Sequence, residues 1–173
     1  MWVKAFLGLG SNQASPSHQL LKAVAWLSTH KAIRLKKQSP LYSSPAMVLA
    51  GESAEGVPDY LNMVVQIETC LAPEEMLAEI KAQEQSQGRD LGAQRWSSRP
   101  VDIDILSYGD QQISTETLTI PHLGIPERDF VLLPWRDIAA DTVIPGLGSV
   151  ADCAASLSGI SARVVAARLA DSK

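Results

Sequence analysis

The sequence predicts an α+β fold in which helices flank an antiparallel β-sheet, arranged as αβα layers around a ferredoxin-like βαββαβ core. Three observations support this prediction. The chain opens on an apolar segment that ends in turn residues, residues 60–68 alternate between apolar and polar side chains, and two stretches with apolar residues at helical spacing separate the expected strands.

The first expected elements are a strand and a helix. Residues 2–9 form the strand, which closes at the turn residues 10–12. The helix begins near Ser15-Pro16, which has the pattern of an N-cap followed by proline in the first turn. Apolar side chains then recur at helical spacing, at Leu20, Val24 and Leu27.

The middle of the chain is expected to hold two strands separated by a long loop. Residues 31–43 form the first strand and residues 60–68 the second. Between them, residues 44–58 contain two proline and two glycine residues with little periodicity. Loops of this length in compact domains are usually functional. A second helix then runs from Pro73 to near Gly88.

The last expected elements are a strand over residues 101–106 and a short helix over residues 128–139. A length of 173 residues fits one domain spanning residues 1–173. We expect its core to span about residues 1–147, with residues 148–173 as a peripheral C-terminal helix and tail.

Composition excludes several classes of protein. The formal net charge of −4 argues against a sequence-independent nucleic-acid binder. No stretch approaches the roughly 20 apolar residues of a membrane span, and the apolar start is explained better by a strand than by a signal peptide. Cys70 and Cys153 lack the spacing of a zinc site and are expected to be reduced and buried. We therefore expect a protein of the cytoplasm. We also expect a monomer, although nothing in the composition decides the oligomeric state.

Asp102 and Asp104 are the strongest candidates for chemistry. Residues two apart on a strand point to the same face, so the two carboxylates lie side by side, while Val101, Ile103 and Ile105 point into the core. Like charges so placed need a counter-ion, and magnesium prefers a few carboxylates together with phosphate oxygens. A solvated polar strand face is an equally good interpretation of this pattern alone.

The residues before this pair indicate phosphate. Arg89, Arg95 and Arg99 crowd one loop, and guanidinium groups bind phosphate oxygens in a forked geometry. Trp96 in the same loop is suited to pack on a ring or act as a lid. Glu84, on the inward line of its helix, lies either at an exposed helix end or in a site.

Other nucleotide motifs are absent from the sequence. There is no G-x-x-x-x-G-K-[ST], so a P-loop is excluded. Gly8-Leu9-Gly10 follows a strand, but Gln13 stands where a dinucleotide-binding fingerprint needs its third glycine. Recognition of RNA by the sheet would need aromatic residues on the strands, and these are nearly missing. His122, after Pro121, is best explained as a structural histidine when taken alone.

Together these motifs resemble the 6-hydroxymethyl-7,8-dihydropterin pyrophosphokinase family over about residues 3–147. The resemblance is carried by Leu9-Gly10-Ser11-Asn12, Pro58-Asp59-Tyr60-Leu61-Asn62, the stretch from Arg95 to Ile105, and Ile120-Pro121-His122 followed by Arg128 and Phe130. It implies transfer of the β,γ-diphosphate of ATP to the pterin hydroxymethyl group in folate biosynthesis, with release of AMP. No general base is identified.

The resemblance also implies roles for individual residues. Asp102 and Asp104 would ligate two Mg²⁺ ions, and Arg89, Arg99 and His122 would stabilise charge during transfer. The positions that match ATP contacts are Glu84, Arg89, Trp96, Arg99, Ile105, His122 and Arg128. The positions that match pterin contacts are Ser44, Pro45, Met47, Tyr60, Asn62, Trp96 and Phe130.

Three residues depart from the family pattern near the nucleotide. Leu91 and Thr117 stand where an arginine is expected, and Leu123 stands where a tyrosine is expected. These three residues favour weaker binding of the nucleotide or a slower catalytic cycle. They also leave open a second hypothesis, a non-catalytic paralogue that binds pterin or nucleotide. A third, an interaction domain with an accidental Asp-x-Asp, is disfavoured because the motifs occur together.

Overall fold

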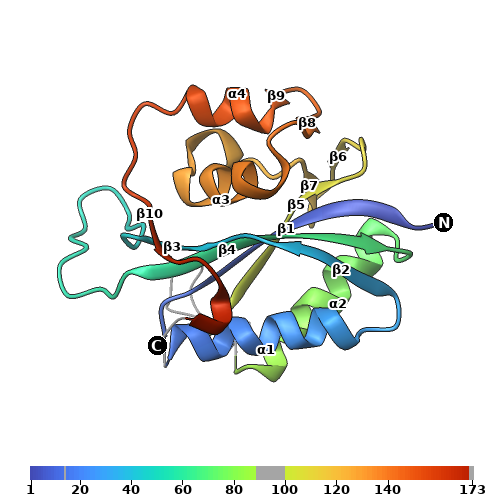
Figure 1. Ribbon diagram of the computed structural model, residues 1–173, viewed down its shortest axis with the longest axis horizontal. Coiled ribbons are helices and arrows are strands. Elements are labelled where there is room, and N and C mark those ends of the chain that lie inside the picture. Colours follow the sequence, from blue (N-terminus) through green and yellow to red (C-terminus); the bar gives the residue numbers. More distant parts are fainter. Residues whose placement is uncertain (14, 89–99, 172–173) are drawn as a thin grey trace.

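The computed structural model describes residues 1–13, 15–88 and 100–171. The main sheet is antiparallel and has six strands in the order β10-β3-β4-β1-β5, with β2 also paired to β4 (Figure 1). The α+β class with helices against an antiparallel sheet is therefore confirmed. The strands of this sheet are β1 (Val3–Ser11), β2 (Ile33–Gln38), β3 (Leu41–Ser44), β4 (Tyr60–Thr69), β5 (Asp102–Tyr108) and β10 (Arg163–Ala166).

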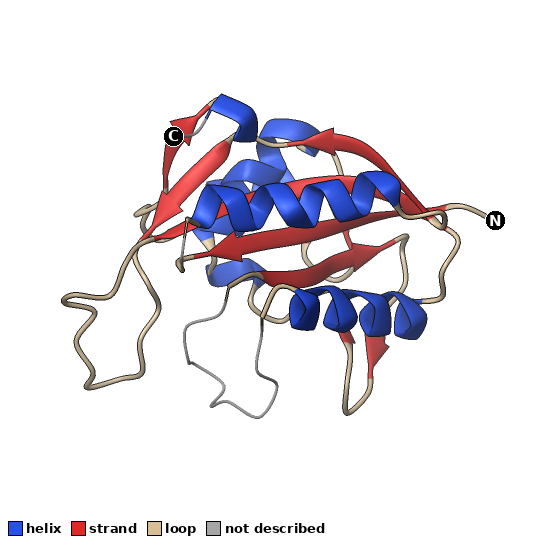
Figure 2. Cartoon of the chain, turned by 90° about the horizontal axis from the view of Figure 1, so that it is seen from below, coloured by secondary structure: helices blue, strands red, loops and turns tan. Residues whose placement is uncertain are grey.

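Helices cover both faces of this sheet. Helices α1 (Pro16–Thr29) and α2 (Pro73–Ser86) lie across one face, as Figure 2 shows. The other face carries α3 (Asp129–Ala139) and α4 (Val150–Ala155). Small elements complete the chain, namely β6 (Ile113–Ser114), β7 (Thr119–Ile120), η1 (Ile125–Glu127), β8 (Val143–Ile144), β9 (Gly148–Ser149) and η2 (Leu169–Asp171). Within the described ranges, no helix is long and apolar enough to cross a membrane.

Strand alternation divides the core into two parts. On β1, Leu7 and Leu9 pack in the cluster on the α1 and α2 side. Phe6 points to the opposite face, where its ring lies 5.0 Å from the ring of the fully buried Trp135 of α3. The period of two along the strand thus anchors both helical layers to the same central strand.

The expected single strand over residues 31–43 is wrong, because the chain forms two strands there. The pairing of β2 with β4 shifts register between Leu35 and Lys37, and β2 ends at Gln38. Pro40 follows and has no N–H to donate to a ladder. At the break, Ser39 exchanges hydrogen bonds with the backbone of Val64, so β2 and β3 occupy successive halves of the same edge of β4.

The expected peripheral helix over residues 148–173 is also wrong. Between residues 148 and 171, the part of that range that the structure describes, only α4 is α-helical, and residues 163–166 form β10 on the edge of β3. The β-branched Val164 and Val165 favour a strand once an edge is available. Leu169 then reaches the α1 side of the sheet and is 4% exposed. The tail thus contributes to the sheet and to the core.

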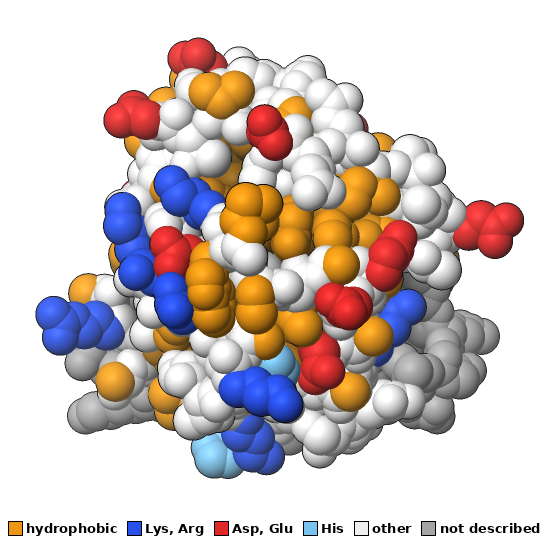
Figure 3. All heavy atoms as spheres, turned by 90° about the vertical axis from the view of Figure 1, so that its right-hand side faces the viewer, with side chains coloured by type: hydrophobic (Ala, Val, Ile, Leu, Met, Phe, Trp, Pro, Cys, Tyr) orange, Lys and Arg blue, Asp and Glu red, His pale blue; other side chains and the backbone are white. Residues whose placement is uncertain are grey.

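Figure 3 shows the end of the molecule that lies at the right of Figure 1. Apolar side chains gather in the middle of this face, with basic side chains on one flank and acidic ones on the other. Trp2, near the N-terminus, is covered by the guanidinium group of Arg34, whose Cζ lies 3.8 Å from the ring centroid. Arg34 also approaches Glu68 at 4.0 Å.

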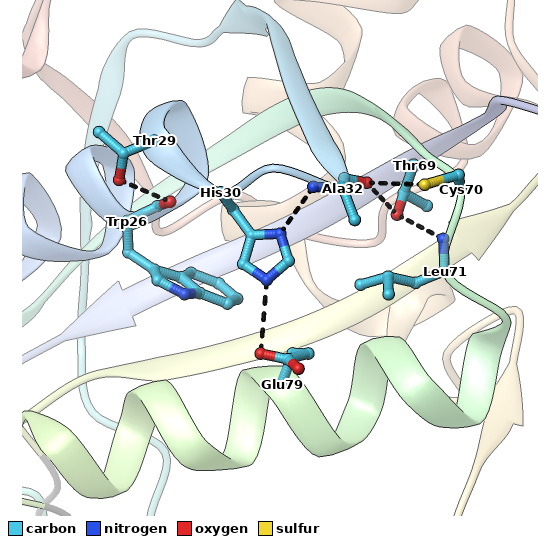
Figure 4. Close-up of polar contacts among 8 residues, drawn as sticks. All are labelled: Trp26, Thr29, His30, Ala32, Thr69, Cys70, Leu71 and Glu79. Carbon is cyan, nitrogen blue, oxygen red and sulfur yellow. Dashed lines mark hydrogen bonds and ion pairs between the residues drawn. The ribbon is translucent and has the colours of Figure 1, made fainter.

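A polar network around His30 joins α1 to α2 (Figure 4). The backbone N–H of Ala32 donates to His30 Nδ1 at 3.1 Å, so Nε2 carries the hydrogen and donates to Glu79 at 3.4 Å. The carbonyl of Ala32 accepts from Thr69 and from the N–H of Cys70. Cys70 and Cys153 are both free, but Cys70 is exposed and Cys153 half-buried, so their expected burial is wrong.

We expect His30→Ala to lower the free energy of unfolding by about 1–2 kcal/mol, because it removes one acceptor, one donor and the edge contact with Trp26. Chemical denaturation measures this. Glu79→Gln, which keeps an acceptor for Nε2, should cost clearly less. An equal loss in both variants would contradict the network.

Candidate active site

Strand β5 presents two carboxylates on one face of the sheet. Asp102 and Asp104 are both partly exposed, whereas Ile103 and Ile105 are buried in the core cluster on the α1 and α2 side. This is the arrangement expected from strand alternation. Because the side chain of Ile105 points away from the aspartates, any contact of this residue with ATP would be made by its backbone.

Two side chains from later in the chain converge on Asp104. Arg128, at the start of α3, places a guanidinium nitrogen 3.5 Å from Asp104 Oδ2, and His122 places Nε2 3.8 Å from the same oxygen. The backbone N–H of His122 donates to the carbonyl of Leu106, which holds this segment against β5. Asp104 keeps 35% of its side chain exposed, so the cluster is open to a ligand.

His122 is a neutral donor at this site. Its Nδ1 accepts from the backbone N–H of Gly124 at 3.0 Å, which leaves the hydrogen on Nε2, facing Asp104. Burial, the larger cause, and the positive charge of Arg128 together lower the pKa of His122 to about 4, with Asp102 opposing the shift. At pH 7 the positive charge beside Asp104 therefore comes from Arg128.

Glu84 supports the strand between the two aspartates. It is 2% exposed, so the alternative of an exposed helix end is excluded. Its Oε1 accepts from the backbone N–H of Ile103 at 3.2 Å. The carboxylate thus binds the outer edge of β5, at the residue that lies between Asp102 and Asp104.

Two glycines of β1 open a strip beside the aspartates. Gly10 pairs with Asp102 on one side and with Asn62 of β4 on the other, and Gly8 pairs with Asp104 in the same way. Paired residues share a face, so Gly10 leaves no side chain of β1 between Asp102 and Asn62, whereas the side chain of Leu106 lies over Gly8. The sequence showed these glycines as an incomplete dinucleotide fingerprint, with Gly10 also in the Leu9-Gly10-Ser11-Asn12 motif. Glycine at every second position of a strand was the signal for the strip.

Asn62 and Ser44 form a buried polar pair beside the strip, on β4 and β3. Asn62 Nδ2 donates to Ser44 Oγ at 2.8 Å, and both residues are buried. The pairing of β3 with β4 brings Ser44 beside Tyr60, which is half-buried. Three of the expected pterin positions are therefore assembled by strand pairing alone.

Phe130 lies above this part of the sheet, on α3. It packs against the cluster of Tyr42, Leu133 and Ala162, and its ring centroid lies 5.8 Å from Arg128 Cζ. Pro45 and Met47 are exposed on the loop after β3. Arg89, Leu91, Trp96 and Arg99 lie outside the described residues. Thr117 and Leu123 are exposed.

Two side chains at the end of β1, those of Ser11 and Asn12, bond to the backbone of Pro100 and Pro58. Ser11 Oγ donates to the carbonyl of Pro100, and Asn12 Nδ2 donates to the carbonyl of Pro58 at 3.3 Å. Both side chains are buried. The Leu-Gly-Ser-Asn motif thus holds Pro58, at the end of the loop over residues 44–58, and Pro100, just before β5, in place.

We expect Gly10→Ala to reduce substrate turnover by about 10- to 100-fold, because a Cβ at Gly10 would lie 3.1 Å from Asn62 Oδ1 and would displace that amide. Gly8→Ala is the matched control, since its Cβ would lie 3.4 Å from the side chain of Leu106, an ordinary contact. Steady-state kinetics of both variants should show a much smaller loss for Gly8→Ala. Equal losses would contradict this role of Gly10.

Comparisons with known proteins agree on one family. The family model of 7,8-dihydro-6-hydroxymethylpterin-pyrophosphokinase (HPPK) matches residues 6–140. Two proteins named 2-amino-4-hydroxy-6-hydroxymethyldihydropteridine pyrophosphokinase, from Haemophilus influenzae and Methylorubrum extorquens, are each 38% identical over 143 residues. Each match covers 83% of this chain and 86% or 87% of the relative.

The fold is also found in solved structures. A crystal structure of Plasmodium falciparum HPPK-DHPS A437G with STZ-DHP matches with a TM-score of 0.68 and 16% identity, and the match covers 90% of this chain. This chain spans 45% of the length of that solved chain.

Proposed function

The chain belongs to the 7,8-dihydro-6-hydroxymethylpterin-pyrophosphokinase family, and from that premise we propose that it transfers the β,γ-diphosphate of ATP to 6-hydroxymethyl-7,8-dihydropterin and releases AMP. It is thereby a diphosphotransferase of folate biosynthesis. The observation that carries this proposal is the juxtaposition of Asp102 and Asp104 with Asn62 across the glycine strip. We further propose that it acts as a monomer in the cytoplasm.

Asp102 and Asp104 fit a magnesium site. They lie on one face, and both are accessible. Among the described residues, no group of three or more His, Cys, Asp or Glu side chains could hold a metal ion by itself. Magnesium bound to nucleotide takes only one or two carboxylates, and phosphate oxygens and water supply its other ligands. When bound, two Mg²⁺ ions would neutralise phosphate charge and align the reacting oxygens.

In this proposal, side chains of the protein bind the phosphates of ATP beside the aspartates. Arg128 is placed to bind phosphate oxygens, because its guanidinium already lies within 3.5 Å of Asp104. His122 offers a neutral Nε2–H to the same region. Arg89, Arg99 and Trp96 are assigned to ATP on the family pattern. Glu84 acts on this side through the backbone of β5.

The pterin would lie over the glycine strip. Asn62 faces the strip with its Oδ1, and its Nδ2 is engaged by Ser44, so the amide orientation is fixed toward a ligand. Phe130 would form one wall of the ring site and Trp96 the other, with Tyr60, Pro45 and Met47 at its border. A flat heterocycle with an amide edge suits one buried amide and aromatic walls.

Transfer in this site needs positioning more than acid–base chemistry. The hydroxymethyl oxygen forms a bond to the β-phosphorus as the bond from that phosphorus to the oxygen of AMP breaks. His122 does not serve as the base, since Nδ1 is occupied by the N–H of Gly124 and Nε2 carries the hydrogen. Orientation and charge neutralisation lower the barrier of such reactions.

The test is to incubate the protein with ATP, magnesium and 6-hydroxymethyl-7,8-dihydropterin and to measure AMP. We expect AMP release that depends on the pterin. No AMP above the pterin-free background would overturn the proposal. Retained pterin binding without AMP would instead support the non-catalytic paralogue, which the exposed Thr117 and Leu123 at expected nucleotide positions favour.

A further inference from the structure

The C-terminal tail runs along one edge of the molecule and contacts all its layers. After α4 it passes beside the start of α3, pairs as β10 with β3, and ends at η2 near α1 (Figure 1). We call residues 161–166 the strap. Arg163 pairs with Ser43 and Val164 with Tyr42, so the strap forms the outer edge next to the strand that carries Ser44.

The strap is bound by a buried carboxylate at the start of α3. Asp129 is 6% exposed, and its Oδ2 accepts from the backbone N–H groups of Ser161 at 2.5 Å and Ala162 at 2.8 Å. The hydroxyl of Ser161 donates to the same oxygen at 3.2 Å. A buried carboxylate with several donors makes strong, charge-assisted hydrogen bonds. This contact therefore fixes the strap and the start of α3 relative to each other.

Asp129 lies between two residues of the candidate site. Arg128 before it contacts Asp104, and Phe130 after it is the expected pterin wall. Helix α3 has no side-chain cap at its N-terminus, so its first turn depends on tertiary contacts such as this one. Ala162 of the strap packs with Tyr42 and Leu133 in the cluster against which Phe130 rests.

We propose that Asp129 is a positioning residue for pterin binding, which holds Phe130 in place by bonding the strap. This inference rests on the proposed function. Arg128 is tied independently to Asp104. Phe130 packs against two clusters, the larger one around Trp135 and the smaller one of Tyr42, Leu133 and Ala162, and the smaller one includes a residue of the strap. The strap therefore supports the pterin side of the site. Loss of its bond to Asp129 should weaken pterin binding more than it lowers kcat.

The test is steady-state kinetics of Asp129→Ala, with the pterin and ATP varied separately. We expect the KM for pterin to rise about tenfold, while kcat and the KM for ATP change by less than about twofold. Asp129→Asn keeps one acceptor oxygen in the same place and should restore most of the pterin affinity. Fluorescence titration of the pterin gives the same comparison without catalysis.

Thr69→Ala is the matched control, because Thr69 is a buried residue that donates a hydrogen bond to the carbonyl of Ala32 at the opposite end of β4 from Asn62. It should leave the KM for pterin unchanged even if its melting temperature falls as far as that of Asp129→Ala. An unchanged pterin KM in Asp129→Ala, or an equal rise in both variants, would overturn the inference.

Three further outcomes can be distinguished. If Asp129→Ala does not fold, the Asp129→Asn variant decides the question by itself. We expect its KM for pterin to rise about threefold, because an uncharged acceptor forms weaker hydrogen bonds. An unchanged KM for pterin in Asp129→Asn would then overturn the inference. A wild-type protein without pterin-dependent AMP release would overturn the proposed function. An active wild type with an unaffected Asp129→Ala variant would overturn the inference about the strap alone.

Discussion

Replacing Asp104 with alanine should reduce AMP release by about 10³-fold or more, while the protein stays folded. Asp104 is the residue on which Arg128 and His122 converge, at 3.5 and 3.8 Å, and it is one of the two proposed magnesium ligands. Its side chain is partly exposed, so its removal leaves no large cavity in the core. The loss should therefore appear in kcat and in magnesium dependence, with little change in the thermal melt.

Asp110→Ala is the control for this variant. Asp110 is an exposed aspartate in the turn after β5, on the same segment of chain but beyond the site. It should keep wild-type activity. Retained activity in Asp104→Ala would remove the metal assignment, and an unfolded Asp104→Ala variant would contradict the view that this residue serves the ligand rather than the fold.

Replacing Asn62 with alanine should raise the KM for pterin by roughly 10- to 100-fold, which corresponds to about 1–3 kcal/mol for a lost buried hydrogen-bonding group. Asn62 is the buried amide that faces the glycine strip, and its Nδ2 is held by Ser44 at 2.8 Å. Its loss removes the group that would read the edge of the pterin ring. The KM for ATP should change little, because the nucleotide side is built from β5 and α3.

Gln66→Ala tests whether this effect is specific. Gln66 is a buried amide on the same strand and the same face, paired with Phe6 rather than with the glycine strip. It should lower stability without a change in the KM for pterin. If Asn62→Ala raises both KM values equally, or leaves the KM for pterin unchanged, the placement of the pterin over the strip is wrong.

Features that depend on local patterning could be predicted from the sequence. The alternation of Asp102 and Asp104 with Ile103 and Ile105 placed the two carboxylates on one face, and the structure has them there. The helical spacing that put Glu84 on the inward line of α2 likewise agrees with its burial. In each case the period of the element decides the direction of the side chain.

Features that depend on contacts between distant segments could not be predicted. Residues 163–166 were expected to be helical, and they form a strand because the edge of β3 is free to pair with them. The neutral state of His122 also depends on distant contacts, because its burial and the positive charge of Arg128 lower its pKa to about 4. The strip at Gly8 and Gly10 exists only through the register of three strands.

The most direct test of the central claim is to follow the β-phosphorus of ATP. ATP labelled at that phosphorus is incubated with the protein, magnesium and 6-hydroxymethyl-7,8-dihydropterin, and the products are separated. Transfer of the β,γ-diphosphate places the label on the pterin, with one unlabelled AMP released for each labelled pterin. Label that remains in ADP, or that appears as free pyrophosphate without a labelled pterin, would contradict the account.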